Sequence, residues 1–177
     1  MLDRLAASGF TAPEPLGAVW ERNGIWLRGA LATREIEAED LAHAVRKSGS
    51  LPTELLRRTG ETLRQMHELG VYHADLNARN ILLGRNGVYV IDFDNARDLM
   101  CGPRGHGGQN GLSAMACARN LLRLRRSIDK LGLPARVFDL ICEGYGTASL
   151  PAWLDYLYRW KGVLSDLASG RVRSHAP

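Results

Sequence analysis

Two short polar motifs, separated by two apolar runs and a turn, constrain this chain more than any other feature of its sequence. The first motif reads HADLNARN from His73 to Asn80, and the second reads DFD from Asp92. Residues 81–83 and 88–91 are apolar and rich in β-formers, and GRNG lies between them, which predicts a hairpin. Two short antiparallel strands return the chain to the edge where it started, so we expect Asp92 to lie beside Asn80.

The rest of the sequence predicts an α+β fold whose second half is helical. Apolar residues at helical spacing predict the helices, and Thr53 is the expected N-cap of one of them. The Asn23-Gly24 pair between two strand-like runs predicts another hairpin, with a type I′ turn. From Phe93 to Gly111 the sequence has no periodicity, which predicts a long loop. The predicted helices span residues 2–8, 38–47, 53–69, 112–131, 134–143 and 150–168, and the first hairpin spans 16–22 and 25–31.

The composition argues against several classes of protein. The net charge is +4 over 177 residues, an excess too mild to indicate a nucleic-acid partner. The three cysteines are far apart and form no C-x-x-C pair, which favours a reducing compartment over a disulfide framework or a zinc ribbon. No run approaches the roughly 18 apolar residues that a membrane helix needs, and the first residues lack the pattern of a secretion signal. We therefore expect a protein of the cytosol or of a membrane face.

The paired motifs resemble the catalytic loop and the metal-binding loop of the protein-kinase-like fold. The resemblance implies an α+β, protein-kinase-like domain with a mostly helical C-lobe, and it implies ATP and Mg²⁺ as cofactors. In phosphoryl transfer a carboxylate orients the acceptor hydroxyl, and oxygen ligands hold Mg²⁺ against the nucleotide phosphates. Asp75 is the expected catalytic residue. Asn80 and Asp92 are the expected metal ligands, since Mg²⁺ prefers carboxylate and amide oxygens.

Other polar residues near the motifs have structural interpretations. His73 is expected to hold the backbone of the loop rather than act in catalysis, as its counterpart does in the resembled fold. Asn77 stands where protein kinases usually carry a lysine, and its simplest interpretation is a turn-former stabilised by its own side chain. Asp94 replaces the glycine of the usual D-F-G, and we favour a supporting role for it. His106 lies among glycines and is expected to be an exposed loop residue.

The residues around the motifs are similar to those of the Kdo kinases, the 3-deoxy-D-manno-octulosonic acid kinases of the bacterial lipopolysaccharide kinase family. The resemblance runs from about residue 2 to about residue 165 and is most specific over 72–94 and 119–128. It implies ATP-dependent phosphorylation of a Kdo hydroxyl on a lipid A precursor. It also implies a cytoplasmic protein that acts at the inner membrane by peripheral contact.

Two patterns in the second half of the chain each have two interpretations. Residues 119–136 carry six cations and one acid, Asp129. Because Arg pairs with carboxylates and phosphates in a bidentate way, this run either binds an anionic substrate or membrane, or is a solvated helix face, the commoner outcome. An apolar stripe follows, for which core packing is a better interpretation than interfacial contact with lipid. The stripe consists of Trp153, Leu154, Leu157, Trp160 and Leu164.

The chain departs from the kinase pattern on its N-terminal side. No glycine-rich G-x-G-x-x-G precedes the first hairpin. A kinase also needs a lysine on an N-lobe strand to hold the phosphates, and Lys47 lies too close to Asp75, on a predicted helix, to be that lysine. We therefore expect residues 1–36 to be an incomplete N-lobe with one hairpin and the hinge, and residues 37–177 to be the C-lobe.

Two explanations for this departure stay open. The chain is either a fragment, or the product of a start-codon error, of an active Kdo kinase, or it is a natural truncated paralogue with little or no activity. The functional alternatives are another small-molecule or serine/threonine kinase of the same fold, and a catalytically inactive kinase-like module.

Overall fold

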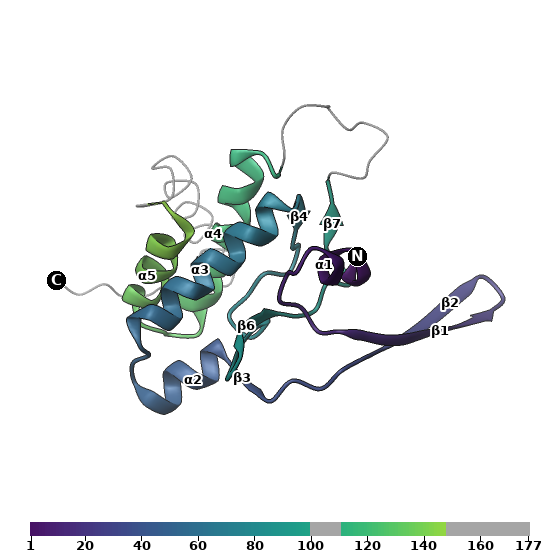
Figure 1. The fold of residues 1–177 in the computed structure, drawn as a ribbon, viewed down its shortest axis with the longest axis horizontal. Coiled ribbons are helices and arrows are strands. Elements are labelled where there is room, and N and C mark those ends of the chain that lie inside the picture. Colours follow the sequence, from purple (N-terminus) through teal and green to yellow (C-terminus); the bar gives the residue numbers. More distant parts are fainter. Residues whose placement is uncertain (100–110, 148–177) are drawn as a thin grey trace, which may run out of the picture.

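The computed structural model describes residues 1–99 and 111–147, in which three small antiparallel sheets lie beside a group of packed helices (Figure 1). Strand β1 (Pro15–Asn23) pairs with β2 (Trp26–Thr33), β3 (Ala38–Asp40) pairs with β5 (Ile81–Gly84), β5 pairs with β6 (Gly87–Val90), and β4 (Val71–Tyr72) pairs with β7 (Arg97–Asp98). The helices are α1 (Leu2–Ala7), α2 (Leu41–Ser48), α3 (Thr53–Glu68), α4 (Ala114–Lys130) and α5 (Ala135–Tyr145).

The hairpin of β1 and β2 projects away from the helices as a ribbon (Figure 1), with Trp20 72% exposed. Its register pairs Asn23 with Trp26, so the two-residue loop is Gly24-Ile25 and not the expected Asn23-Gly24. Gly24 has a φ of 61°, and neither Asn23 nor Ile25 has a positive φ. A positive φ at the first central residue alone is typical of a type II′ turn with glycine there, so the predicted type I′ turn is wrong.

The hairpin of β5 and β6 forms where it was predicted, and β3 adds a third strand to it. Gly84 pairs with Gly87 across the turn. Residues 38–40, which were predicted to be helical, form β3 because they pair with β5. Asp40 then serves as the N-cap of α2, with its Oδ1 accepting a hydrogen bond from the backbone N–H of His43 at 2.9 Å.

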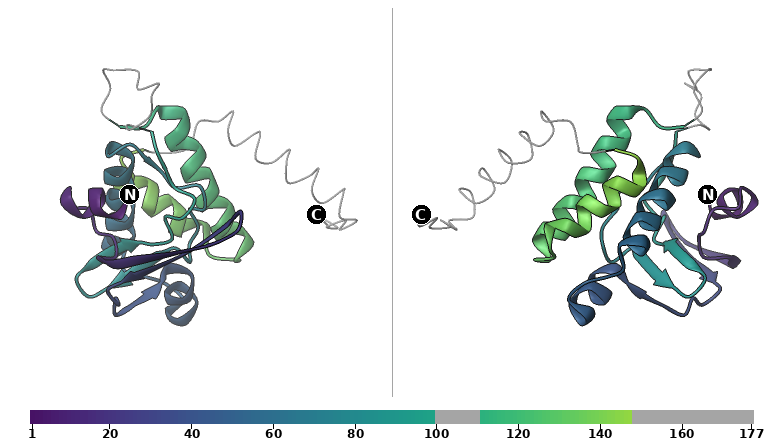
Figure 2. Two further views of the ribbon diagram at one scale, coloured as in Figure 1. Left: turned by 90° about the vertical axis from the view of Figure 1, so that its right-hand side faces the viewer. Right: turned by 60° about the vertical axis from the view of Figure 1, so that its left-hand side comes forward.

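Helix α3 lies between the small sheets and α5 (Figure 2). Its apolar face contributes Leu63 to a core that also contains Leu124 of α4 and Ile141 of α5, each of them fully buried. The helices predicted for this half are confirmed at α3, α4 and α5. The predicted cap is wrong, because Pro52 occupies the N-cap of α3 and Thr53 is already its first helical residue.

The segment that was predicted to be a loop contains the short strand β7, whose two residues pair with β4. A two-residue strand is too short to show a periodic pattern, so the sequence carried no signal for it. The rest of that predicted loop, with His106, and the predicted helix over 150–168 with its apolar stripe lie outside the described residues. Within residues 1–99 and 111–147, no helix is both long and apolar enough to cross a membrane.

Candidate active site

The first motif forms a loop between β4 and β5, and we call residues 73–80 the catalytic-loop segment. His73 at its start is fully buried, and its Nε2 lies 2.9 Å from the carbonyl oxygen of Ile91, to which it donates. This bond joins the start of the loop to the residue that precedes Asp92. The structure therefore confirms that His73 holds the backbone of the loop.

Asn77 shapes the middle of the same segment. Its Nδ2 donates to the carbonyl oxygen of Asp75 at 2.8 Å, and its Oδ1 accepts from the backbone N–H of Arg79 at 2.9 Å. An Asn side chain that bonds to the backbone two residues away on either side stabilises a tight turn. The interpretation of Asn77 as a turn-former is confirmed.

Asn80 joins the two motifs. Its Nδ2 donates to the carbonyl oxygen of Asp75 at 3.1 Å and to Oδ2 of Asp92 at 3.3 Å. The hairpin of β5 and β6 therefore returns Asp92 to Asn80, as the spacing predicts. Because Nδ2 makes both bonds, the side chain presents Oδ1 as the atom that is suited to a metal ion.

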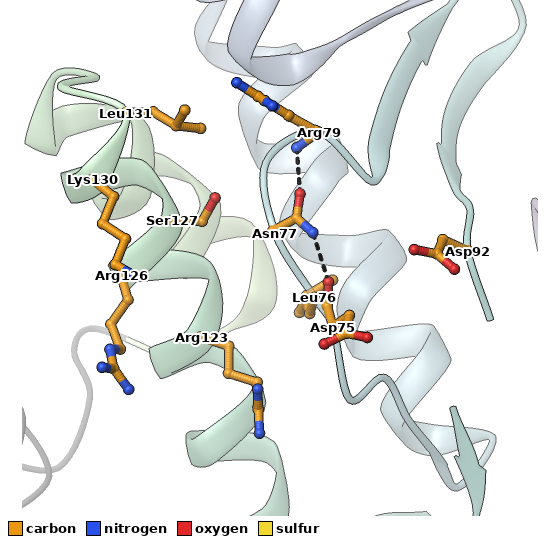
Figure 3. Close-up of a pocket in the computed structure, with 10 residues that line it drawn as sticks. All are labelled: Asp75, Leu76, Asn77, Arg79, Asp92, Arg123, Arg126, Ser127, Lys130 and Leu131. Atoms are coloured by element: carbon orange, nitrogen blue, oxygen red, sulfur yellow. Dashed lines mark hydrogen bonds between the residues drawn. The ribbon is translucent and has the colours of Figure 1, made fainter. Parts of the chain in front are cut away.

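Asp92 has an unusual backbone conformation. Its φ is 64°, and among the described residues it is the only non-glycine residue with a positive φ. This region costs an L-residue roughly 1–2 kcal/mol, and such conformations cluster at functional sites, where the surrounding structure maintains them. Figure 3 shows the exposed Asp92 side chain pointing toward the loop that carries Asp75.

Asn95 also belongs to this site, although no pattern in the sequence indicates it. Its Nδ2 donates to Oδ2 of Asp75 at 3.0 Å, so it fixes one oxygen of this exposed carboxylate. Asn95 follows the second motif directly, in a stretch with no periodicity. The only available signal was its position immediately after Asp94.

Asn120 of α4 is a second residue that no sequence pattern indicates, and it holds the start of the catalytic-loop segment. It is fully buried. Its Oδ1 accepts from the backbone N–H of His73 at 3.2 Å and from Nε2 of His67 at 3.0 Å, and its Nδ2 donates to the carbonyl oxygen of His73 at 2.6 Å. Seven residues further along α4, Oγ of Ser127 accepts from the backbone N–H of Ala78 at 3.1 Å. Helix α4 therefore anchors both the start and the middle of the catalytic-loop segment.

His67 completes this buried network in its neutral form. Its Nε2 donates to Asn120, so Nδ1 accepts from the hydroxyl of Tyr145, 2.8 Å away. Burial lowers the pKa of His67 to about 4, although the hydrogen bond to Asn120 acts in the opposite direction. The unfolded chain binds this proton near pH 6.5, so stability from the neutral ring is complete above that pH and is lost as the pH falls toward 4.

The difference between His67→Gln and the unaltered protein is expected to isolate this effect. Between pH 7 and pH 4 the unaltered protein should lose about 3 kcal/mol of unfolding free energy through His67, and His67→Gln should not. Urea unfolding at the two pH values measures the difference. His43→Gln, at an exposed histidine on α2, is the matched control and should keep the full pH dependence. An equal loss in both variants would contradict the burial argument.

Two hollows open on either side of Asp92, which lines both. One is partly apolar, contains Leu82 and Ile91, and is bounded by the segment from Arg34 to Ile36 that connects β2 to β3. The other runs between the catalytic-loop segment and α4 and is lined mostly by polar and cationic side chains (Figure 3). With the Asp92 carboxylate between a partly apolar and a cationic hollow, the site is suited to two substrates of different chemistry.

The donors near Asp92 limit how a metal ion could be held. In the described part of the chain, no three His, Cys, Asp or Glu side chains come together in a way that could bind a metal. The available set is therefore an amide oxygen from Asn80 and carboxylate oxygens from Asp92. Few protein ligands, all of them oxygens, suit Mg²⁺ better than a transition metal.

Comparison with known proteins gives one consistent family. Residues 1–145 match the model of the lipopolysaccharide kinase (Kdo/WaaP) family. A 3-deoxy-D-manno-octulosonic acid kinase of Photobacterium profundum is 34% identical over 153 residues, which are 82% of this chain and 59% of that relative. The kinase of the same name from Haemophilus influenzae strain 86-028NP is 34% identical over 137 residues, which are 73% of this chain and 52% of the relative. The chain spans little more than half the length of these relatives.

One solved structure supports the same fold. It is described as WaaP in complex with acyl carrier protein, and it superposes with a TM-score of 0.63 at 18% sequence identity, covering 90% of this chain and 71% of the other. At this identity the likeness shows the fold alone. The α+β, protein-kinase-like fold that was expected from the paired motifs is confirmed.

Proposed function

Because the chain belongs to the lipopolysaccharide kinase (Kdo/WaaP) family, we propose that it catalyses the ATP-dependent phosphorylation of a Kdo hydroxyl on a lipid A precursor. The names of its relatives support the type of acceptor. The observation that supports the proposal is that Asn80 bonds to the backbone of Asp75 and to the carboxylate of Asp92, while both aspartates line one hollow. Since the acceptor is a lipid, the proposed place of action is the cytoplasmic face of the inner membrane, by peripheral contact.

In the proposed reaction, Asp75 is the catalytic residue. The acceptor hydroxyl oxygen forms a bond to the γ-phosphorus of ATP, the bond from that phosphorus to the β–γ bridging oxygen breaks, and ADP leaves with the electron pair. The hydroxyl proton passes to the Asp75 carboxylate. Asn95 acts as a positioning residue, because its bond to Oδ2 of Asp75 restrains the carboxylate and leaves Oδ1 to act on the acceptor.

Asn80 and Asp92 are the proposed Mg²⁺ ligands. The Asn80 amide is fixed by its two Nδ2 bonds, and the backbone of Asp92 is held at a positive φ, so both oxygen donors are set before any ion binds. When bound, Mg²⁺ would neutralise charge on the phosphates of the nucleotide. The donor set fits this ion because it consists of carboxylate and amide oxygens.

The partly apolar hollow is the proposed site for the base of ATP. Leu82 and Ile91 offer apolar side chains for a planar ring, and the connection between β2 and β3 bounds the same hollow, as a hinge would. Its other side chains include Asp92 and Asp94, so a nucleotide in this hollow would point its phosphates toward the proposed metal ligands. This placement supports the proposal that residues 1–36 form the N-lobe part and hinge, and residues 37–177 the C-lobe.

The test is a transfer assay with the purified chain, radiolabelled ATP and a Kdo-bearing lipid A precursor. Label is expected in the acceptor when Mg²⁺ is present and is expected to disappear when EDTA removes the ion. A reaction without acceptor is the blank. Acceptor labelling no greater than this blank would contradict the proposal, and labelling of protein serine or threonine with none of the Kdo acceptor would favour a different kinase.

A further inference from the structure

Cationic side chains gather in the hollow between the catalytic-loop segment and α4, and we call this hollow the basic groove. Arg79 lines it from the loop, and Arg123, Arg126 and Lys130 line it from α4 (Figure 3). The only carboxylates in its lining, among the described residues, are those of Asp75 and Asp92. The groove therefore has an acidic part at the proposed reaction site and a cationic part beside it.

The helical spacing explains why these cations share the groove. Arg123, Arg126 and Lys130 follow each other at three and four residues, which places them on one face of α4. Seven residues of an α-helix rise about 10 Å, so the positive charges extend along the helix for about that length. Such a row fits a ligand with more than one anionic group better than a single small ion.

Arg123 shares two hollows with Asp75. It lines the basic groove and also a second, smaller hollow on another side of Asp75, together with Asn95 and Arg97. Its Nε donates to the hydroxyl of Tyr72 at 3.3 Å, which ties the guanidinium to the residue before His73. Arg123 is therefore held beside the carboxylate that would receive the acceptor proton.

Hydrogen bonds join the two walls of the basic groove, which are the catalytic-loop segment and α4. Asn120 lies one helical turn before Arg123 and is bonded to both backbone polar groups of His73. Ser127 lies between Arg126 and Lys130 in sequence and accepts the backbone N–H of Ala78. The cations on α4 are thus carried by a helix that is fixed to the loop of Asp75 at two points.

We propose that the basic groove binds the anionic groups of the phosphoryl acceptor and so places its hydroxyl at Asp75. This inference rests on the proposed function and adds the recognition residues to it. The ligand chemistry is a carboxylate or phosphate borne by a sugar, because Arg binds both groups through paired N–H donors and Lys binds both as a point charge. The partly apolar hollow on the other side of Asp92 is left for the nucleotide.

Steady-state kinetics of Arg126→Gln, Lys130→Gln and the double variant tests the inference. Each single variant is expected to raise the KM for a Kdo-bearing, phosphorylated oligosaccharide about tenfold, and the double variant about a hundredfold, as for charge-assisted hydrogen bonds. The KM for ATP should not change. Arg136→Gln, at an exposed arginine on α5 that does not line the groove, is the matched control and should behave as the unaltered chain.

Direct binding separates this inference from the proposed function. Calorimetric titration of the Asp75→Asn chain, without ATP, measures the affinity for the same oligosaccharide, for free Kdo and for inorganic phosphate. The oligosaccharide should bind most tightly of the three. Adding Arg126→Gln and Lys130→Gln to this chain should lower its affinity for the oligosaccharide about a hundredfold. If no transfer occurs but this loss of affinity is seen, the proposed function fails and the groove stands. The inference is overturned by unchanged oligosaccharide affinity, by a raised KM for ATP instead, or by variants that lose only binding to anionic phospholipid vesicles.

Discussion

Asp75→Asn is expected to reduce phosphoryl transfer to the acceptor by about a thousandfold, because an amide cannot accept the hydroxyl proton. The substitution keeps the size of the side chain and leaves an oxygen that can still accept the bond from Asn95. The KM for ATP and the midpoint of thermal unfolding should therefore change little. Initial rates with saturating Mg²⁺ and ATP measure the effect on turnover.

The control for this variant is Glu61→Gln, which also removes one negative charge from an exposed carboxylate, on the middle of α3. Its rate should equal that of the unaltered chain. If Asp75→Asn retained more than about a tenth of the activity, Asp75 would not be the proton acceptor, since general bases contribute factors of about a hundred or more.

Gly60→Ala is expected to destabilise the fold by about 3 kcal/mol, the upper end of the usual cost of overpacking. A Cβ at Gly60 of α3 would overlap the carbonyl oxygen of Ile141 and the backbone nitrogen of Tyr145, both on α5. Gly144 of α5 meets the backbone of Arg57 in the same way. Backbone atoms cannot rotate away as side chains do, so α3 and α5 would have to separate. For a chain of this size the unfolding midpoint should fall by about 6–12 °C.

Gly17→Ala is the matched control for Gly60→Ala. Gly17 lies in β1, and a Cβ there would meet no heavy atom of another part of the chain within 4 Å. Its unfolding midpoint should stay within about 2 °C of the unaltered chain. A midpoint for Gly60→Ala that also stayed in that interval would show that the two helices do not approach as closely as described.

The parts of the fold that follow from the sequence are those with local causes. The apolar runs after Asn80 and before Asp92 have strand composition and a turn of the right length between them, so their pairing and the meeting of these two side chains follow from local sequence. Asn77 forms its turn with residues two positions away, which is also a local effect. The amphipathic pattern of α3 likewise predicts its buried face.

The parts that do not follow depend on distant partners. Asn120 reads as one more polar residue of a basic helix, and its role appears only when His73, 47 residues earlier, is placed against it. Asn95 bonds to Asp75 across 20 residues of chain that include the whole second hairpin. Residues 38–40 have a helical pattern, yet pairing with β5 makes them a strand. In each case a tertiary contact determines the conformation or the role of the residue, and the local sequence does not reveal that contact.

If the proposed function holds, the attachment of α4 to the catalytic-loop segment has a consequence for which acceptors the site would bind. The distance from the Asp75 carboxylate to the cations on α4 is held constant by the bonds of Asn120 and Ser127 to the catalytic-loop segment. The carboxylate and the cations would therefore select ligands by a fixed distance. Acceptors would be sorted by the spacing between their hydroxyl and their nearest negative charge, so regioisomers of one sugar with identical composition would be told apart without any contact specific to the sugar ring.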